Sequence, residues 1–195
     1  MDPTKTEFYL EKLLTEGLGF DLSDPNLTDT PKRIAKMYTT ELFHNVGEEF
    51  PEADFRKFPN DEKYDQIMMV DNIHFTSMCS HHFMPFTGKA WFLYIPNEFD
   101  LVGVSKLPRL VEHYSARPQL QENLCHQILN RFIEVMQPKG AMLVMRAIHG
   151  CMSCRGVRQY NNTGMTSSAL YGSFKQLETR EEGMSLINLS LTGGL

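Results

Sequence analysis

The chain has 195 residues, of which 42% are hydrophobic and 22% charged, and its formal net charge is −5. This length and composition fit one ordinary globular domain with a substantial core. No apolar run approaches the ~18 residues of a membrane span, and the first residues lack the basic and apolar segments of a secretory signal. Because the net charge is negative, no overall field attracts a polyanion. We therefore predict a cytoplasmic protein without a membrane or nucleic-acid partner, whose phosphate site, if any, is a local cluster of Lys and Arg.

Two helices are predicted at the N-terminus. The first runs from about residue 4 to residue 14 and opens with Thr4 and Glu7 at capping-box spacing. The second runs from about residue 29 to residue 42 and has Pro31 at its start. The stretch that follows, residues 48–65, is rich in Pro, Asp and Asn and predicts an ordered loop.

The rest of the chain alternates strands and helices. Residues 66–76 and 87–95 contain the branched and aromatic side chains of strands, and Met78–Pro85 between them is too polar to continue either. Antiparallel hairpins with paired helices between them predict an α+β fold. The later elements are predicted as helices at about 105–115 and 118–136, strands at about 141–149 and 169–174, and a final helix opened by a capping box of Thr179 and Glu182.

Two separate Cys/His segments suggest a metal site. Cys79 and His82 have C-x₂-H spacing in the polar loop, and Cys151 follows a predicted strand end. Catalytic zinc takes three such ligands and keeps a fourth position for water. The alternative is that these cysteines are small buried hydrophobic residues, which is common for free cysteine. Of the other cysteines, Cys125 is interpreted as helix core and Cys154 as a spare thiol near the site.

Two histidines remain beside these ligands. His81 and His149 can each take and give a proton near neutral pH, because the pKa of imidazole is ~6.5. Hydrogen-bonded scaffolding is an equally good interpretation from spacing alone.

Several charged and polar residues could bind an anionic substrate. Lys106 and Arg109 share a face at a predicted helix start, and we expect them beside the metal residues together with Arg155. Arg33 is a further candidate, although any one of these residues is more often a solvated surface charge. At the start of the long helix, the carboxylate of Glu122 could accept hydrogen bonds from guanine, with Gln121 beside it as donor and acceptor. The alternative is a polar first turn favoured by the helix dipole.

Several motifs in one order resemble the GTP cyclohydrolase I family. The resemblance extends from about Asp29 to Arg180. The similar stretches are DTPKRIAKMY, FTSMCSHHFMPFTGKA, VGVSKLPRLVEHYSARPQLQENL, IHGCMSCRGV and, more loosely, TSSALYGSFK and TREE.

The resemblance implies an architecture and a reaction. It implies the tunnelling fold, an antiparallel sheet with helices packed on one face, here with an N-terminal helical region at residues 1–50 and a catalytic region at residues 51–195 in one structural unit. It also implies a toroidal homodecamer with active sites between subunits. The implied reaction converts GTP to 7,8-dihydroneopterin triphosphate and formate, a step from which folate, biopterin and 7-deazaguanine routes begin.

The same resemblance implies a role for each candidate residue. Zn²⁺ is held by Cys79, His82 and Cys151, and protons are transferred by His81 and His149. Ser105 serves the later rearrangement of the sugar. The implied substrate contacts are Gln121 and Glu122 for guanine and ribose, Lys106, Arg109 and Arg155 for the triphosphate, and Arg33 across the subunit interface.

One position departs from the family pattern. Ser80 stands where the family usually has glutamate, which removes a carboxylate that could orient His81 or raise its pKa. Two alternatives stay open. One is a related hydrolase that stops at a ring-opened intermediate, which Ser80 favours, and the other is a non-catalytic, zinc-stabilised binding protein of the same fold.

Overall fold

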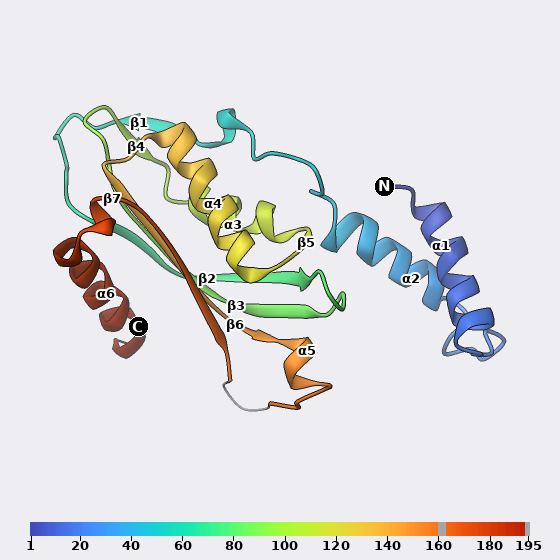
Figure 1. The fold of residues 1–195 in the computed structure, drawn as a ribbon. Helices are drawn as coiled ribbons and strands as arrows, with labels where there is room; N and C mark the ends of the chain where they lie inside the picture. The colour runs from blue at the N-terminus through green and yellow to red at the C-terminus, as the bar shows by residue number, and fades with distance from the viewer. Residues whose placement is uncertain (160–162, 194–195) are drawn as a thin grey trace. The chain divides into compact units, whose positions relative to one another are not determined.

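The computed structural model describes residues 1–159 and 163–193, which form two compact units, Met1–Gly47 and a second that begins at Glu48. The second unit combines a mainly antiparallel sheet with helices, so the predicted α+β class is confirmed (Figure 1). Among the helices of the described residues, none is both long enough and apolar enough to cross a membrane.

The first unit is helical, as predicted. Each of its two α-helices runs on into a wider π-type turn. Its elements are α1 (Pro3–Lys12), η1 (Leu13–Gly17), α2 (Thr30–Lys36) and η2 (Met37–Leu42).

The start of α1 differs from the prediction in detail. The N-cap is Asp2, whose carboxylate accepts a hydrogen bond from the backbone N–H of Lys5 at 3.0 Å. Pro3 takes the first helical position, where its lack of an N–H costs nothing. The predicted capping box of Thr4 and Glu7 is therefore wrong, because an aspartate followed by proline is the stronger start signal.

The second unit is built on a five-stranded sheet. All neighbouring strands pair antiparallel except the short edge strand β5, which pairs parallel with β2. In their order across the sheet, the strands are β5 (Pro118–Gln119), β2 (Met68–Cys79), β3 (Pro85–Ile95), β6 (Gly140–His149) and β7 (Met165–Gly172).

Long-range pairing produces the differences from the predicted elements. Pro118 and Gln119 pair with Met78 and Cys79, so the long helix begins three residues later than predicted. The predicted loop 48–65 contains η3 (Glu52–Asp54) and β1 (Lys57–Pro59), and β1 pairs with β4 (Asp100–Val102) in a separate two-stranded sheet. The last strand extends from Met165 to Gly172 rather than from 169 to 174.

Two helices cover one face of the sheet. Along β3 the side chains alternate, and Ala90, Phe92 and Tyr94 join the larger core cluster. The helices α3 (Lys106–Ser115) and α4 (Gln121–Met136) supply the other side of this cluster with leucine, isoleucine and phenylalanine side chains. The amphipathic periods of helix and strand thus meet in one core.

The opposite face carries the C-terminal helix. Trp91 and Leu93 of β3 point into a second, smaller core with Phe174 of η4 (Ser173–Lys175) and Ile187 of α6 (Leu177–Thr192). The predicted capping box of Thr179 and Glu182 is wrong, because the N-cap of α6 is Gln176, three residues before Thr179.

Candidate metal centre and its surroundings

Antiparallel pairing gathers three chain segments at one end of the sheet. β2 ends at Cys79, the turn of residues 80–84 follows, and β3 begins beside the last residues of β6, where Phe86 pairs with His149. The short helix α5 (Gly150–Ser153) follows β6 directly and carries Cys151. Residues far apart in sequence therefore meet at this end for a topological reason.

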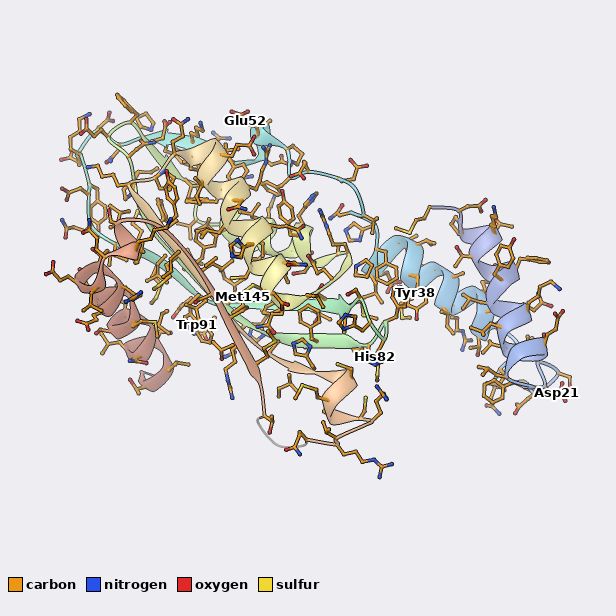
Figure 2. All side chains as sticks on the ribbon, in the orientation of Figure 1. Asp21, Tyr38, Glu52, His82, Trp91 and Met145 are labelled. Carbon is orange, nitrogen blue, oxygen red and sulfur yellow. The ribbon has the colours of Figure 1, made fainter. Side chains whose placement is uncertain are left out.

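Backbone hydrogen bonds hold the turn. The N–H of Cys79 donates to the carbonyl oxygen of Met84 at 2.9 Å, and the N–H of Phe83 donates to the carbonyl oxygen of Cys79 at 2.8 Å. Phe83 adopts a left-handed backbone conformation, with φ of 49°, which closes the turn. His82 lies exposed at this tip of the β2–β3 hairpin (Figure 2).

A glycine allows the third segment to approach. A Cβ at Gly150 would lie 2.9 Å from the carbonyl oxygen of Pro85, closer than side chains normally come. The absence of a side chain lets the end of β6 pass close to the start of β3. Cys151 is thereby brought to the turn.

Cys79, His82 and Cys151 form a group that could hold a metal ion. One potential ligand atom from each lies within 4.8 Å of the others, and their exposure runs from buried for Cys79 to exposed for His82. Tetrahedral zinc with Zn–S of ~2.3 Å and Zn–N of ~2.0 Å needs ligand atoms roughly 3.5–3.8 Å apart. The observed spacing of up to 4.8 Å exceeds this by an amount that small side-chain rotations can close, so the residues present fit a zinc ion.

The other two cysteines lie outside this group. Cys125 is fully buried in α4, and burial raises the pKa of its thiol to about 12, as expected for helix core. Cys154 is exposed, and its thiol donates to the carbonyl oxygen of Gly150 at 2.8 Å.

His149 is the more enclosed of the two candidate proton-transfer residues. Its ring stacks on Phe86 with centroids 4.6 Å apart and planes 3° apart, and its Nε2 lies 2.8 Å from Oε1 of Gln121. Burial lowers the pKa of His149, and the nearby carboxylate of Glu122 opposes this shift. His81 lies exposed in the turn.

Gln121 and Glu122 open α4 at the same end of the sheet but differ in exposure. Glu122 is exposed and near enough to His149 to influence it electrostatically. Gln121 is only 1% exposed, and both ends of its amide are engaged by protein groups. A role for Gln121 as a reader of guanine would require these bonds to break.

The basic candidates separate into two places. Burial, and then the neighbouring Cys79, raise the pKa of the Cys151 thiol. Arg155 lies close enough to oppose this shift in part. Arg33 belongs to the first unit, on α2, where it pairs with Asp29 at 3.3 Å.

Lys106 and Arg109 lie toward the opposite end of the sheet. Leu107 lines a small cavity with Met68 and Val70 at the start of β2, whereas Ser77 near the end of β2 donates to the backbone beyond α3. From Val70 to Cys79 the strand spans roughly 25–30 Å. The expectation that Lys106 and Arg109 lie beside the metal residues is therefore wrong within one chain. Ser105, which precedes α3, lies with them.

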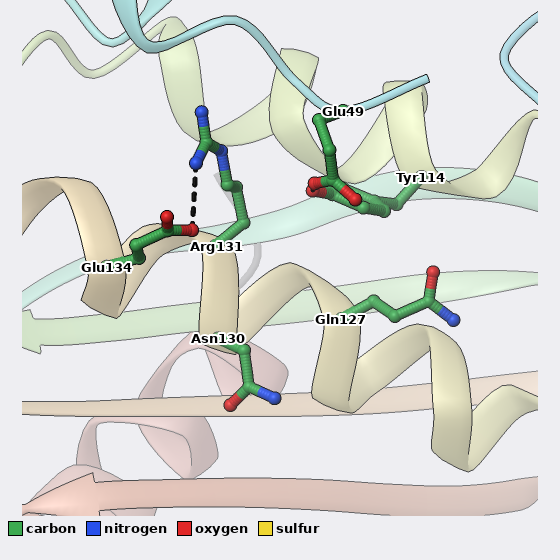
Figure 3. Close-up of a pocket in the computed structure, with 6 residues that line it drawn as sticks. All are labelled: Glu49, Tyr114, Gln127, Asn130, Arg131 and Glu134. Atoms are coloured by element: carbon green, nitrogen blue, oxygen red, sulfur yellow. Dashed lines mark hydrogen bonds and ion pairs between the residues drawn. The ribbon is translucent and has the colours of Figure 1, made fainter. Parts of the chain in front are cut away.

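A separate polar pocket of about 390 Å³ lies on the outer side of α3 and α4 (Figure 3). Its charged groups have partners: Arg131 pairs with Glu134 at 2.8 Å, and the hydroxyl of Tyr114 donates to Glu49. The pKa of Tyr114 is raised to about 12, mainly by burial and in addition by the hydrogen bond with Glu49. This pocket contains none of the predicted site residues.

Fold and site together define an α+β protein with a group of two cysteines and one histidine that could hold a metal ion. The family model for GTP cyclohydrolase I matches residues 7–188. The chain therefore belongs to the GTP cyclohydrolase I family of enzymes. That membership, with the antiparallel sheet and the helices α3 and α4 on one face, confirms the predicted tunnelling fold, to which α6 adds a helix on the other face.

Individual relatives agree with the family match. The chain is 43% identical over 177 residues to GTP cyclohydrolase 1 of Desulforamulus reducens, which covers 90% of this chain and 92% of that one. It is 40% identical over 188 residues to GTP cyclohydrolase 1 of Carboxydothermus hydrogenoformans, with 96% and 95% covered. The crystal structure of the archaeosine synthase QueF-Like in the apo form gives a TM-score of 0.45 at 15% identity, covering 55% of this chain and 95% of that one, too partial a likeness to inform the function.

Proposed function

We propose that this chain is a zinc-dependent enzyme that converts GTP and water to 7,8-dihydroneopterin triphosphate and formate, a first step toward folates and other pterins or toward 7-deazaguanine compounds. The observation that carries the proposal is the grouping of Cys79, His82 and Cys151 in a chain of this family. The name shared by the relatives, GTP cyclohydrolase 1, supports GTP as substrate.

The ligand set suits the proposed chemistry. Two thiolates and one imidazole would hold zinc and leave one position for a small molecule. When bound, zinc would supply Lewis acidity, which makes water acidic enough to act as a nucleophile near neutral pH. His82 lies exposed in the turn of residues 80–84, so a small molecule could reach this group from solvent.

Two histidines would move protons around the purine. We assign proton transfer to His81 and His149, since protonation of N7 makes C8 more electrophilic and favours attack by water. The ring of His149 stacks on the ring of Phe86, which fixes its orientation. His81 is exposed and can contact a substrate that enters from solvent. Ser105 is assigned to the later rearrangement of the ribose carbons.

The substrate contacts require more than one subunit. Glu122 and Arg155 lie at the metal end of the sheet, where a carboxylate can bind guanine and a guanidinium can bind phosphate. Lys106 and Arg109 lie at the other end, too far away to bind the same triphosphate within one chain. This separation supports a homo-oligomer, proposed as a toroidal decamer, in which a second copy supplies Lys106 and Arg109.

The first unit has a proposed part in the same assembly. Arg33 stands at the start of α2, and we assign it to the triphosphate across a subunit interface. Residues 51–195 are proposed as the catalytic region and residues 1–50 as the helical region attached to it. A cytoplasmic location stays a prediction.

Product identification tests the function. Purified protein loaded with zinc is incubated with GTP, and pterin absorbance and released formate are measured, with a parallel sample stripped by a chelator and then reloaded. Formation of both products only in the zinc-loaded samples is expected. Formate without pterin would indicate a hydrolase that stops early, an outcome that Ser80 favours. Neither product would indicate a zinc-stabilised binding protein.

A further inference from the structure

Gln121 is a buried amide whose polar atoms all face protein partners. Its Nε2 lies 3.0 Å from the carbonyl oxygen of Met145, 3.1 Å from that of Met165 and 3.1 Å from Oγ of Ser167. Its Oε1 lies 2.8 Å from Nε2 of His149. With 1% of the residue exposed, water does not compete for these atoms.

These partners fix which way the amide points. The carbonyl oxygens of Met145 and Met165 only accept hydrogen bonds, so the atom of Gln121 that faces them must be the NH₂ group. A flipped amide would place its oxygen against two other oxygens in a buried position and leave those acceptors without a donor, which is unfavourable. Oε1 therefore faces His149.

The fixed amide determines the proton on His149. Oε1 of Gln121 can only accept, so Nε2 of His149 must carry the hydrogen that bridges them. In the neutral ring, Nδ1 is then the unprotonated nitrogen. Phe86 stacks parallel to the ring and blocks rotation out of this plane, so both the tautomer and the orientation are set.

We propose that Gln121 is a positioning residue that holds His149 as the Nε2–H tautomer and leaves Nδ1 as the atom that exchanges a proton with the substrate. This inference rests on the proposed function of His149 as a proton-transfer residue. It gives Gln121 a role through His149 instead of a direct contact with guanine. The reach of Gln121 from the first turn of α4 to the end of β6 couples the two elements that flank the site.

Kinetics of Gln121→Met test the role. Methionine fills a similar volume but accepts no strong hydrogen bond, so we expect kcat to fall by about 10–100-fold, as is typical when an orienting partner is removed. The KM for GTP should stay within about threefold and the zinc content should not change. A raised KM with unchanged kcat would instead make Gln121 a substrate reader and overturn the proposal.

Gln119→Met is the matched control. Gln119 is also buried, at 6% exposure, and lies two residues away, but its amide contacts Ser77 and the backbone carbonyl of Tyr114 instead of a histidine. We expect this variant to lose a comparable amount of stability while kcat stays within about twofold. Equal losses of kcat in both variants would reduce Gln121 to a packing residue.

A spectroscopic measurement on wild-type protein needs no activity and uses a variant only to assign signals. In zinc-loaded wild-type protein labelled with ¹⁵N-histidine, at pH 8, the His149 signals are assigned by their absence in His149→Gln. We expect Nε2 to show the shift of a protonated nitrogen and Nδ1 that of an unprotonated one; the reverse overturns the proposal. Failure of wild-type protein to turn over GTP would sink the proposed function and leave this measurement valid.

Discussion

The two ends of the main sheet differ in how many of the candidate site residues one chain brings together there. At one end, the end of β2, the start of β3 and the end of β6 bring Cys79, His82, Cys151 and His149 together within one chain. At the other end, Lys106 and Arg109 stand on the first turn of α3. Strand pairing within the chain assembles the first end, whereas the second carries cations that lie far from that group in one chain.

This comparison separates two kinds of functional residue. The ligand group depends on close backbone packing, as the approach of Gly150 to Pro85 shows, and so must be built by a single fold. The charges at the start of α3 are proposed to act on a flexible triphosphate, and a neighbouring copy could supply them. Variants at the two ends should therefore fail in different ways.

The largest effect is expected from Cys151→Ala. Loss of one of three ligands should abolish stoichiometric zinc binding and lower turnover of GTP by on the order of 10³-fold or more, because the Lewis acid is lost. Metal analysis and formate release measure the two losses. Cys154→Ala is the matched control, since its exposed thiol lies outside the ligand group and both quantities should stay unchanged. Full zinc content with full turnover in Cys151→Ala would refute the ligand assignment.

His81→Ala should separate chemistry from metal binding at the same end. The exposed ring lies outside the ligand group, so zinc should remain stoichiometric while kcat falls by about 10²–10⁴-fold, as is usual on loss of a general acid or base. Metal analysis and steady-state kinetics check this. An unchanged rate would make His81 a scaffolding residue.

Lys106→Ala should weaken the other end without touching the metal. Loss of one charged contact to a phosphate should raise the KM for GTP by about 10–100-fold at constant zinc content. Co-expression with Cys151→Ala sharpens the comparison. If each site uses the two ends from different copies, mixed oligomers assayed at GTP well below the raised KM should show roughly a quarter of wild-type activity, more than either variant alone. No recovery in verified mixed oligomers would place both ends in one copy and contradict the shared site.

The smallest effect is expected from Ser80→Glu. A carboxylate beside His81 could orient its ring and stabilise its protonated form, so we expect kcat to rise by about two- to fivefold; the effect is modest because the position is exposed to solvent. Steady-state kinetics at fixed zinc content, with Ser80→Gln as an uncharged control, measure the gain. A rate that does not rise with either variant would show that Ser80 costs this enzyme nothing.

Local patterns in the sequence predicted most elements but not their exact starts. The amphipathic period predicted a helix at about 105–115, and α3 spans Lys106–Ser115. The two capping boxes were wrong, because the N-cap residues are Asp2, before Pro3, for α1 and Gln176 for α6. The edge strand β5 exists only through its pairing with β2, so no local pattern could indicate it.

The candidate site divides in the same way. Cys/His spacing pointed to Cys79, His82 and Cys151, and the structure brings them together. Spacing could not reveal that Gln121 is buried with its amide directed at His149, because Met145 and Met165, which fix that amide, lie more than twenty residues along the chain.

By itself, the sequence determined the chemistry available to this protein: soft metal ligands, imidazoles and a few cations, together with the periodicities of its helices and strands. Tertiary structure alone decided which of these groups share a place, drawing four of them to one end of the sheet and leaving Lys106 and Arg109 toward the other. The physical reason is that side-chain identity and local periodicity are written along the chain, whereas strand pairing joins residues that are distant along it.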